Sequence, residues 1–129
     1  MSDSALNENS VALLSTTTVT FAAATVTTLY TVPAGKILFL DHLTIIGSAD
    51  ATTTTVTVGR STALTDWLGT QTLSNIAAAS DVVTLRPIQA ATPVKEKAYV
   101  AAVIIQVDVS ATGGGTTHKF KLYGTLYDA

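Results

Sequence analysis

The sequence predicts an all-β domain, an antiparallel sandwich of two sheets with one short helix. Threonine occurs 24 times in 129 residues, and its β-branched side chain suits strands, where the hydroxyl faces water while the methyl packs on neighbours. Charged residues make up only 12% of the chain, about half the usual share. Stretches in which apolar and polar residues alternate recur between turn signals, at the spacing typical of a sandwich.

The first half of the chain predicts an arm followed by strands. Residues 1–15 are largely polar and begin without periodicity, so we expect a flexible N-terminal arm before a β-sandwich domain over residues 16–129. Residues 17–21 alternate as a strand does, and so do residues 26–32. The tetrapeptide P-A-G-K at 33–36 is a turn, because proline fixes φ and glycine allows a positive φ.

The stretch ILFLDHLTII at residues 37–46 predicts a strand in mid-sheet. It is apolar on both faces apart from Asp41, His42 and Thr44, so we expect it to be covered on both sides. After a turn, residues 53–58 alternate again.

Residues 61–69 interrupt this alternation. Leu64, Trp67 and Leu68 stand at positions i, i+3 and i+4, which is the spacing of one face of a helix. Ser61 or Thr62 could cap the start and Gly69 could end it. We therefore predict one or two helical turns that close an end of the sandwich, with Trp67 in the core rather than free to stack on a sugar.

Three strands complete the predicted sandwich. Residues 82–88 form one, and Pro87 indicates a sheet edge. Residues 99–109 form a long apolar strand, and residues 117–127 follow a glycine loop at 113–115. The side chains expected in the core are Phe39, Leu43, Ile45, Val56, Leu68, Leu85, Val103, Ile105, Phe120 and Leu122.

Residues that could carry chemistry are few. His42 beside Asp41 is the one suggestive pair, but adjacent side chains on a strand point to opposite faces, so we expect no hydrogen bond between them. His118 is expected to be structural, at a strand end. Cysteine is absent and the aspartates are isolated, which gives no ligand spacing for a metal, although a cation shared between subunits stays open. We therefore expect no enzyme and no catalytic, cofactor or metal residues.

Candidate partner contacts lie on the last strand and near the N-terminus. Tyr123 and Tyr127 share the outward face of residues 117–127, and Leu6, Val11 and Leu13 are apolar residues of the N-terminal region. We expect these five residues to contact a partner. A solvated sheet face is the alternative for the two tyrosines. The net charge of −2, with dispersed basic residues, predicts neither nucleic acid nor a membrane as a partner.

One part of the chain resembles virion proteins of tailed bacteriophages. The stretch Y-T-V-P-A-G-K-I-L-F-L-D-H-L-T-I at 30–45 is followed by a small-residue turn, S-A-D-A at 48–51, and then by T-V-T-V-G at 55–59. V-V-T-L-R-P-I at 82–88 and K-E-K-A-Y-V at 95–100 continue the pattern. The resemblance covers roughly residues 26–110.

This resemblance implies a jelly-roll-like sandwich that assembles with copies of itself on a phage particle. A capsid decoration (cement) protein is preferred: a homotrimer bound to the major capsid protein, made in the host cytoplasm without a signal peptide. The low charge agrees with a homo-oligomer. A tail or fibre component, a receptor- or glycan-binding module and a small β-sandwich enzyme are the alternatives.

Overall fold

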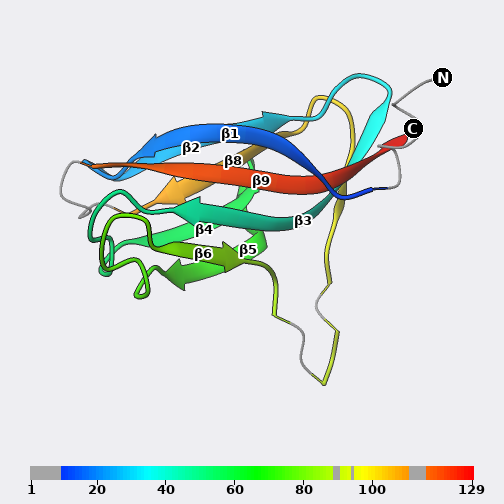
Figure 1. Ribbon diagram of the computed structural model, residues 1–129. Helices are drawn as coiled ribbons and strands as arrows, with labels where there is room; N and C mark the ends of the chain where they lie inside the picture. The colour runs from blue at the N-terminus through cyan, green and yellow to red at the C-terminus, as the bar shows by residue number, and fades with distance from the viewer. Residues whose placement is uncertain (1–9, 89–90, 94, 111–115) are drawn as a thin grey trace.

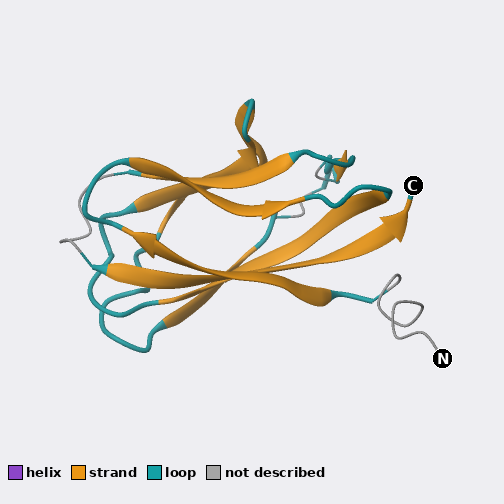
Figure 2. Cartoon of the chain, turned by 90° about the horizontal axis from the view of Figure 1, so that it is seen from above, coloured by secondary structure: helices purple, strands orange, loops and turns teal. Residues whose placement is uncertain are grey.

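The computed structural model describes residues 10–88, 91–93, 95–110 and 116–129, and in these residues it contains strands and no helix (Figures 1 and 2). The strands are β1 (Ala12–Thr20), β2 (Thr25–Thr31), β3 (Lys36–Ile46), β4 (Thr55–Arg60), β5 (Ala63–Thr72), β6 (Val82–Leu85), β7 (Ala98–Tyr99), β8 (Ile104–Val109) and β9 (Thr117–Asp128). No helix in the described ranges is long and apolar enough to cross a membrane.

The strands pair in a nested order. β1 pairs with β9, β2 with β8, β3 with β6, and β4 with β5, all antiparallel. Further pairing of β3 with β9 and of β4 with β8 joins these pairs into two sheets. The first has the order β1-β9-β3-β6, with the short β7 also beside β3, and the second has the order β2-β8-β4-β5. Apart from the short β7, each sheet has four antiparallel strands, and this wrapping defines a jelly roll, so the predicted sandwich is confirmed.

The two sheets, named here the β1 sheet and the β2 sheet, lie face to face as two layers (Figure 2). Alternate residues of each strand point between them. Phe21 and Phe120 meet edge to face in this core, with ring centroids 6.0 Å apart. Most side chains predicted to be buried are buried: Leu43, Ile45, Val56, Leu68, Ile105, Phe120 and Leu122, with Leu85 and Val103 packed against them.

Phe39 is the exception, and the expectation that β3 is covered on both sides is wrong. Phe39 is 40% exposed, whereas its neighbours Leu38 and Leu40 are buried. β3 does lie inside its sheet, between β9 on one edge and β6 and β7 on the other. Because only one face of this sheet meets the other sheet, the apolar residues of the opposite face stay at the surface.

The helix predicted over residues 61–69 is also wrong. These residues form a turn and most of β5, and Arg60 stands opposite Ala63 across the hairpin. The register with β4 shifts twice along this hairpin, and each shift breaks the alternation of the strand. Trp67 and Leu68, although adjacent, are therefore both buried. A bulged strand thus reproduced the spacing of a helix face.

The stretch expected as one long strand over residues 99–109 is divided into β7 and β8. Ala102 interrupts it with a φ of 70°, a left-handed conformation that strands do not contain. β6 lies at an edge of the β1 sheet, as Pro87 indicated. β1 already begins at Ala12, where it faces Gly124 of β9; residues 1–9 of the expected arm and the glycine loop at 113–115 lie outside the described residues.

Candidate interaction face

Two irregularities of strand register meet at Tyr123 and Gly124 of β9, on the outward face of the β1 sheet. On one side, Leu14 is an extra residue in β1, between the pairs Leu13–Tyr123 and Ser15–Leu122. On the other side an extra residue in β3 interrupts the register with β9. A Cβ atom at Gly124 would lie 2.7 Å from a backbone oxygen of β3, so glycine is what permits this close approach.

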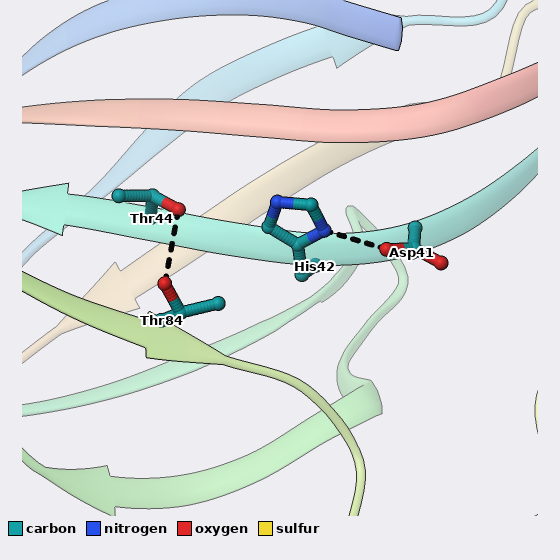
Figure 3. Close-up of polar contacts among 4 residues, drawn as sticks. All are labelled: Asp41, His42, Thr44 and Thr84. Carbon is teal, nitrogen blue, oxygen red and sulfur yellow. Dashed lines mark hydrogen bonds and ion pairs between the residues drawn. The ribbon is translucent and has the colours of Figure 1, made fainter. Parts of the chain in front are cut away.

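The extra residue in β3 is Asp41, and it corrects the expectation for Asp41 and His42. Leu40 pairs with Gly124 and His42 with Tyr123, so Asp41 has no partner residue and the alternation breaks at this point. The Asp41 carboxylate lies 2.6 Å from His42 Nδ1 (Figure 3). The predicted absence of a hydrogen bond is therefore wrong, since it assumed a regular strand.

The His42 ring is held from two directions. Asp41 accepts the hydrogen bond at Nδ1, which fixes the orientation of the imidazole, and Tyr123 stacks on the ring with centroids 4.4 Å apart and planes 14° from parallel. Within the described residues no hydroxyl group hydrogen-bonds to His42, and no three acidic, histidine or cysteine residues are grouped to hold a metal ion. The hydroxyl of Thr44, on the same strand, forms its hydrogen bond instead with the hydroxyl of Thr84 on β6. Within the described residues the Asp41–His42 pair therefore lacks the hydroxyl partner of a serine-type triad.

Two of the predicted contact residues meet on this face, because Leu13 of β1 stands directly opposite Tyr123 of β9. Tyr127 lies further along β9, opposite Ile37. Leu13 is 49% exposed and Tyr127 40%, whereas Tyr123 is half-buried. Val11 is exposed just before β1, and Leu6 lies outside the described residues. We name this surface the tyrosine face and define it as Leu13, Phe39, His42, Tyr123 and Tyr127. The sequence did not predict that Phe39 and His42 belong to it.

The opposite end of the same sheet face carries a groove that the sequence did not reveal. Thr16 and Thr18 of β1 stand opposite Lys121 and Lys119 of β9, and Ile46 of β3 lies on the other side of Lys119. These residues line an open groove of about 550 Å³ together with Gly47, Ser48, Thr117 and His118. Lys119 and Lys121 alternate along β9 with the buried Phe120 and Leu122, but only the pairing with β1 and β3 shows that the two lysines share a groove.

His118 is buried beneath this end of the sheet. Its Nδ1 accepts a hydrogen bond of 3.1 Å from the backbone amide of Ser48, and its Nε2 lies 2.9 Å from Thr116 Oγ1. The ring also packs on Phe21, with centroids 4.2 Å apart. Burial lowers the pKa of His118, because the charged form loses its hydration. His118 is thus placed as a structural residue, closing the turn after β3.

A polar cluster joins the two sheets near the β4–β5 hairpin. The Asp66 carboxylate lies 2.9 Å from Arg60 Nε and accepts hydrogen bonds from the Arg60 amide and from the Tyr99 hydroxyl, at 3.2 and 2.9 Å. Burial, followed by the hydrogen bond to Asp66, raises the pKa of Tyr99. Since Tyr99 belongs to β7 and the other two residues to the β2 sheet, the cluster ties the sheets together.

Comparison with known proteins extends the fold assignment. No family model matches the sequence, and no curated protein is detectably similar to it. A chain in the capsid asymmetric unit of cyanophage Pam1 has a TM-score of 0.53 at 16% identity, over 92% of this chain and 85% of that chain. A chain in the acidic stable capsid of Helicobacter pylori bacteriophage KHP30 has a TM-score of 0.56 at 17% identity, over 95% and 94%. At these identities the likeness is one of fold.

Proposed function

We propose that this chain is a structural protein of a tailed-phage particle, a decoration subunit that binds the outer shell and stabilises it. In this proposal it forms a homo-oligomer, a trimer, and contacts the major capsid protein. The support is that its jelly roll, from one end of the chain almost to the other, resembles chains found in two phage capsid structures. The trimer comes from the resemblance to decoration proteins.

The observation that carries the proposal is the tyrosine face. The outward face of an antiparallel sheet is usually polar when it meets water. Here Leu13, Phe39 and Tyr127 expose large apolar surfaces on one sheet, and tyrosine and phenylalanine are enriched where proteins meet. Clustered apolar residues of this kind indicate a partner surface.

A glycan-binding module is less well supported by the geometry. Sugar recognition would use exposed aromatic rings gathered at a loop end. Trp67 is only 4% exposed within β5, and the ring of Tyr123 is stacked on His42. His42 covers one face of the Tyr123 ring, so Tyr127 alone of these three aromatic residues is well exposed, and one exposed ring does not form a gathered aromatic site.

The test uses particles of the phage that carries this chain, prepared with and without it and heated while DNA release is followed by dye fluorescence. Decorated shells should release DNA at the higher temperature, because a protein that binds the assembled lattice stabilises it by mass action. Equal release temperatures, or labelled protein found on tails, would refute the decoration proposal.

Two matched variants test the surface. Tyr127→Asp should abolish shell binding, because it places a charge within the tyrosine face. Val26→Asp is the control, since Val26 is 45% exposed on β2 of the other sheet, and it should bind as the unchanged protein does. Equal loss with both variants would contradict the role of the tyrosine face.

A further inference from the structure

The lysine groove on the β1 sheet has a charge that the described part of the chain leaves unbalanced. Lys119 and Lys121 stand two residues apart on β9, and no described carboxylate forms an ion pair with either. The groove lining contains no acidic residue. Threonine hydroxyls flank the lysines from β1, so the groove has both cations and neutral hydrogen-bonding groups to offer an acidic ligand.

Five of the seven described side-chain carboxylates are already engaged, and the other two, Glu96 and Asp108, lie outside the groove. Asp128 pairs with Lys36, Asp66 with Arg60, and Asp41 with His42. Asp50 accepts hydrogen bonds within its own turn, and Asp81 accepts two from backbone amides.

The first nine residues, MSDSALNEN, carry two further carboxylates, Asp3 and Glu8, and no lysine or arginine side chain. This acidic segment therefore complements the groove in charge.

We propose that the lysine groove binds the acidic N-terminal segment, residues 1–9, of a second copy of this chain. The segment joins β1 near Ala12, which stands opposite Gly124, whereas the groove lies at the other end of β1, beside Thr16 and Thr18. To reach its own groove the segment would have to reverse at once and run back along β1. A segment from a neighbouring copy enters the groove without that reversal, and nine residues span up to about 30 Å.

This inference rests on the self-association in the proposed function but not on binding to a shell. It is therefore tested on the purified full-length protein alone, with the oligomer mass measured by sedimentation over a range of concentrations. Lys119→Glu with Lys121→Glu should weaken self-association at least tenfold, and so should Asp3→Lys with Glu8→Lys. The association of the unchanged protein should also weaken in high salt, because salt screens exposed charges.

The control is Lys95→Glu with Lys97→Glu. These lysines have the same spacing, one exposed and one half-exposed as in the groove, but they lie outside the groove. Their reversal should leave the oligomer mass unchanged.

Mixing the two charge-reversed proteins identifies the copy that supplies the segment. Each alone should associate at least tenfold more weakly than the unchanged protein, and the mixture should regain association, because each segment then meets a groove of opposite charge. If association returns only when both reversals are combined in one chain, the segment binds its own groove and the proposal is overturned. Unchanged mass in both reversed proteins, or an equal loss in the control, overturns it as well. If the reversed proteins lose association and their mixture regains it, while bare shells prove as stable as decorated ones, the decoration proposal fails and this inference stands.

Discussion

Phe39 and Phe120 have the same side chain but opposite surroundings, which makes them a matched pair for testing the fold. Phe120 is fully buried and contacts Phe21 edge to face. Replacing it with alanine removes a complete core side chain and leaves a cavity, at a cost of about 3–5 kcal/mol in unfolding free energy. Phe39 lies on the surface of the same sheet with 40% of it exposed. Full burial of a phenylalanine contributes about 1.5–3 kcal/mol, so Phe39→Ala should cost about 1–2 kcal/mol.

The measurement is urea unfolding followed by tryptophan fluorescence. Trp67 is the single tryptophan of the chain and is buried, so its emission reports the opening of the core. Midpoint and slope together give the free energy of unfolding, and an unchanged slope shows that only stability has changed. The series should be repeated at low protein concentration, because an oligomer stabilises its subunits by mass action.

Dilution separates the two positions further. The cost of Phe39→Ala should shrink on dilution if Phe39 lies in a contact between copies, while the cost of Phe120→Ala should stay constant. A Phe39→Ala protein as unstable as Phe120→Ala at every concentration would refute the placement of Phe39 on the surface.

Three other predictions concern single groups. Because the pKa of His118 is lowered in the fold, its contribution to stability should be constant above the unfolded pKa of about 6.5 and should fall as the pH drops below that value. His118→Asn, which can keep an acceptor near the position of Nδ1, should flatten this part of the stability–pH curve. An unchanged slope would exclude His118 as the cause of the pH dependence. Gly59→Ala should cost about 1–3 kcal/mol by overpacking, since its Cβ would lie 2.2 Å from a backbone oxygen of β5, whereas Gly69→Ala on the same hairpin meets no atom within 4 Å and should melt close to the unchanged protein. Tyr99→Phe should cost about 1.5–3 kcal/mol, the contribution of a hydrogen bond to a charged group such as Asp66, and a thermal melt identical to the unchanged protein would show that this hydrogen bond adds nothing.

Regular strands were predictable from the sequence because their burial follows a period of two. In β8, Ile105, Val107 and Val109 are buried while Gln106 and Asp108 face outward, as the alternation indicated. β9 follows the same pattern through Phe120 and Leu122. Each of these strands buries one face against the opposite sheet, so apolar residues occur at every second position of the sequence.

Bulged strands were not predictable in the same way, because an extra residue changes which face each following side chain takes. In β5 two register shifts put Trp67 and Leu68 side by side in the core, and the pattern looked helical. In β3 the extra Asp41 brought its carboxylate to His42. The glycines opposite these irregularities, Gly59 and Gly124, were the available signal, since glycine inside a strand often marks a bulge or a close backbone approach.

The two outward faces of the sandwich differ in chemistry, and this difference gives the subunit an orientation. The β1 sheet presents the tyrosine face at one end and Lys119 with Lys121 at the other, whereas the central strands of the β2 sheet present Thr57, Gln106 and Asp108. Burying apolar groups against a partner lowers the free energy of the complex. Burying threonine, glutamine and aspartate side chains raises it unless every polar atom finds a hydrogen-bonding partner. We therefore expect the β1 sheet to face neighbouring subunits and the shell, and the β2 sheet to face solvent. In that orientation the bulges at Leu14 and Asp41 contribute to assembly as well as to folding, because they set the register in which Tyr123 stands between Leu13 and His42. Tyr123 stacks on His42 in this register, and Leu13 and Phe39 are exposed on the same face.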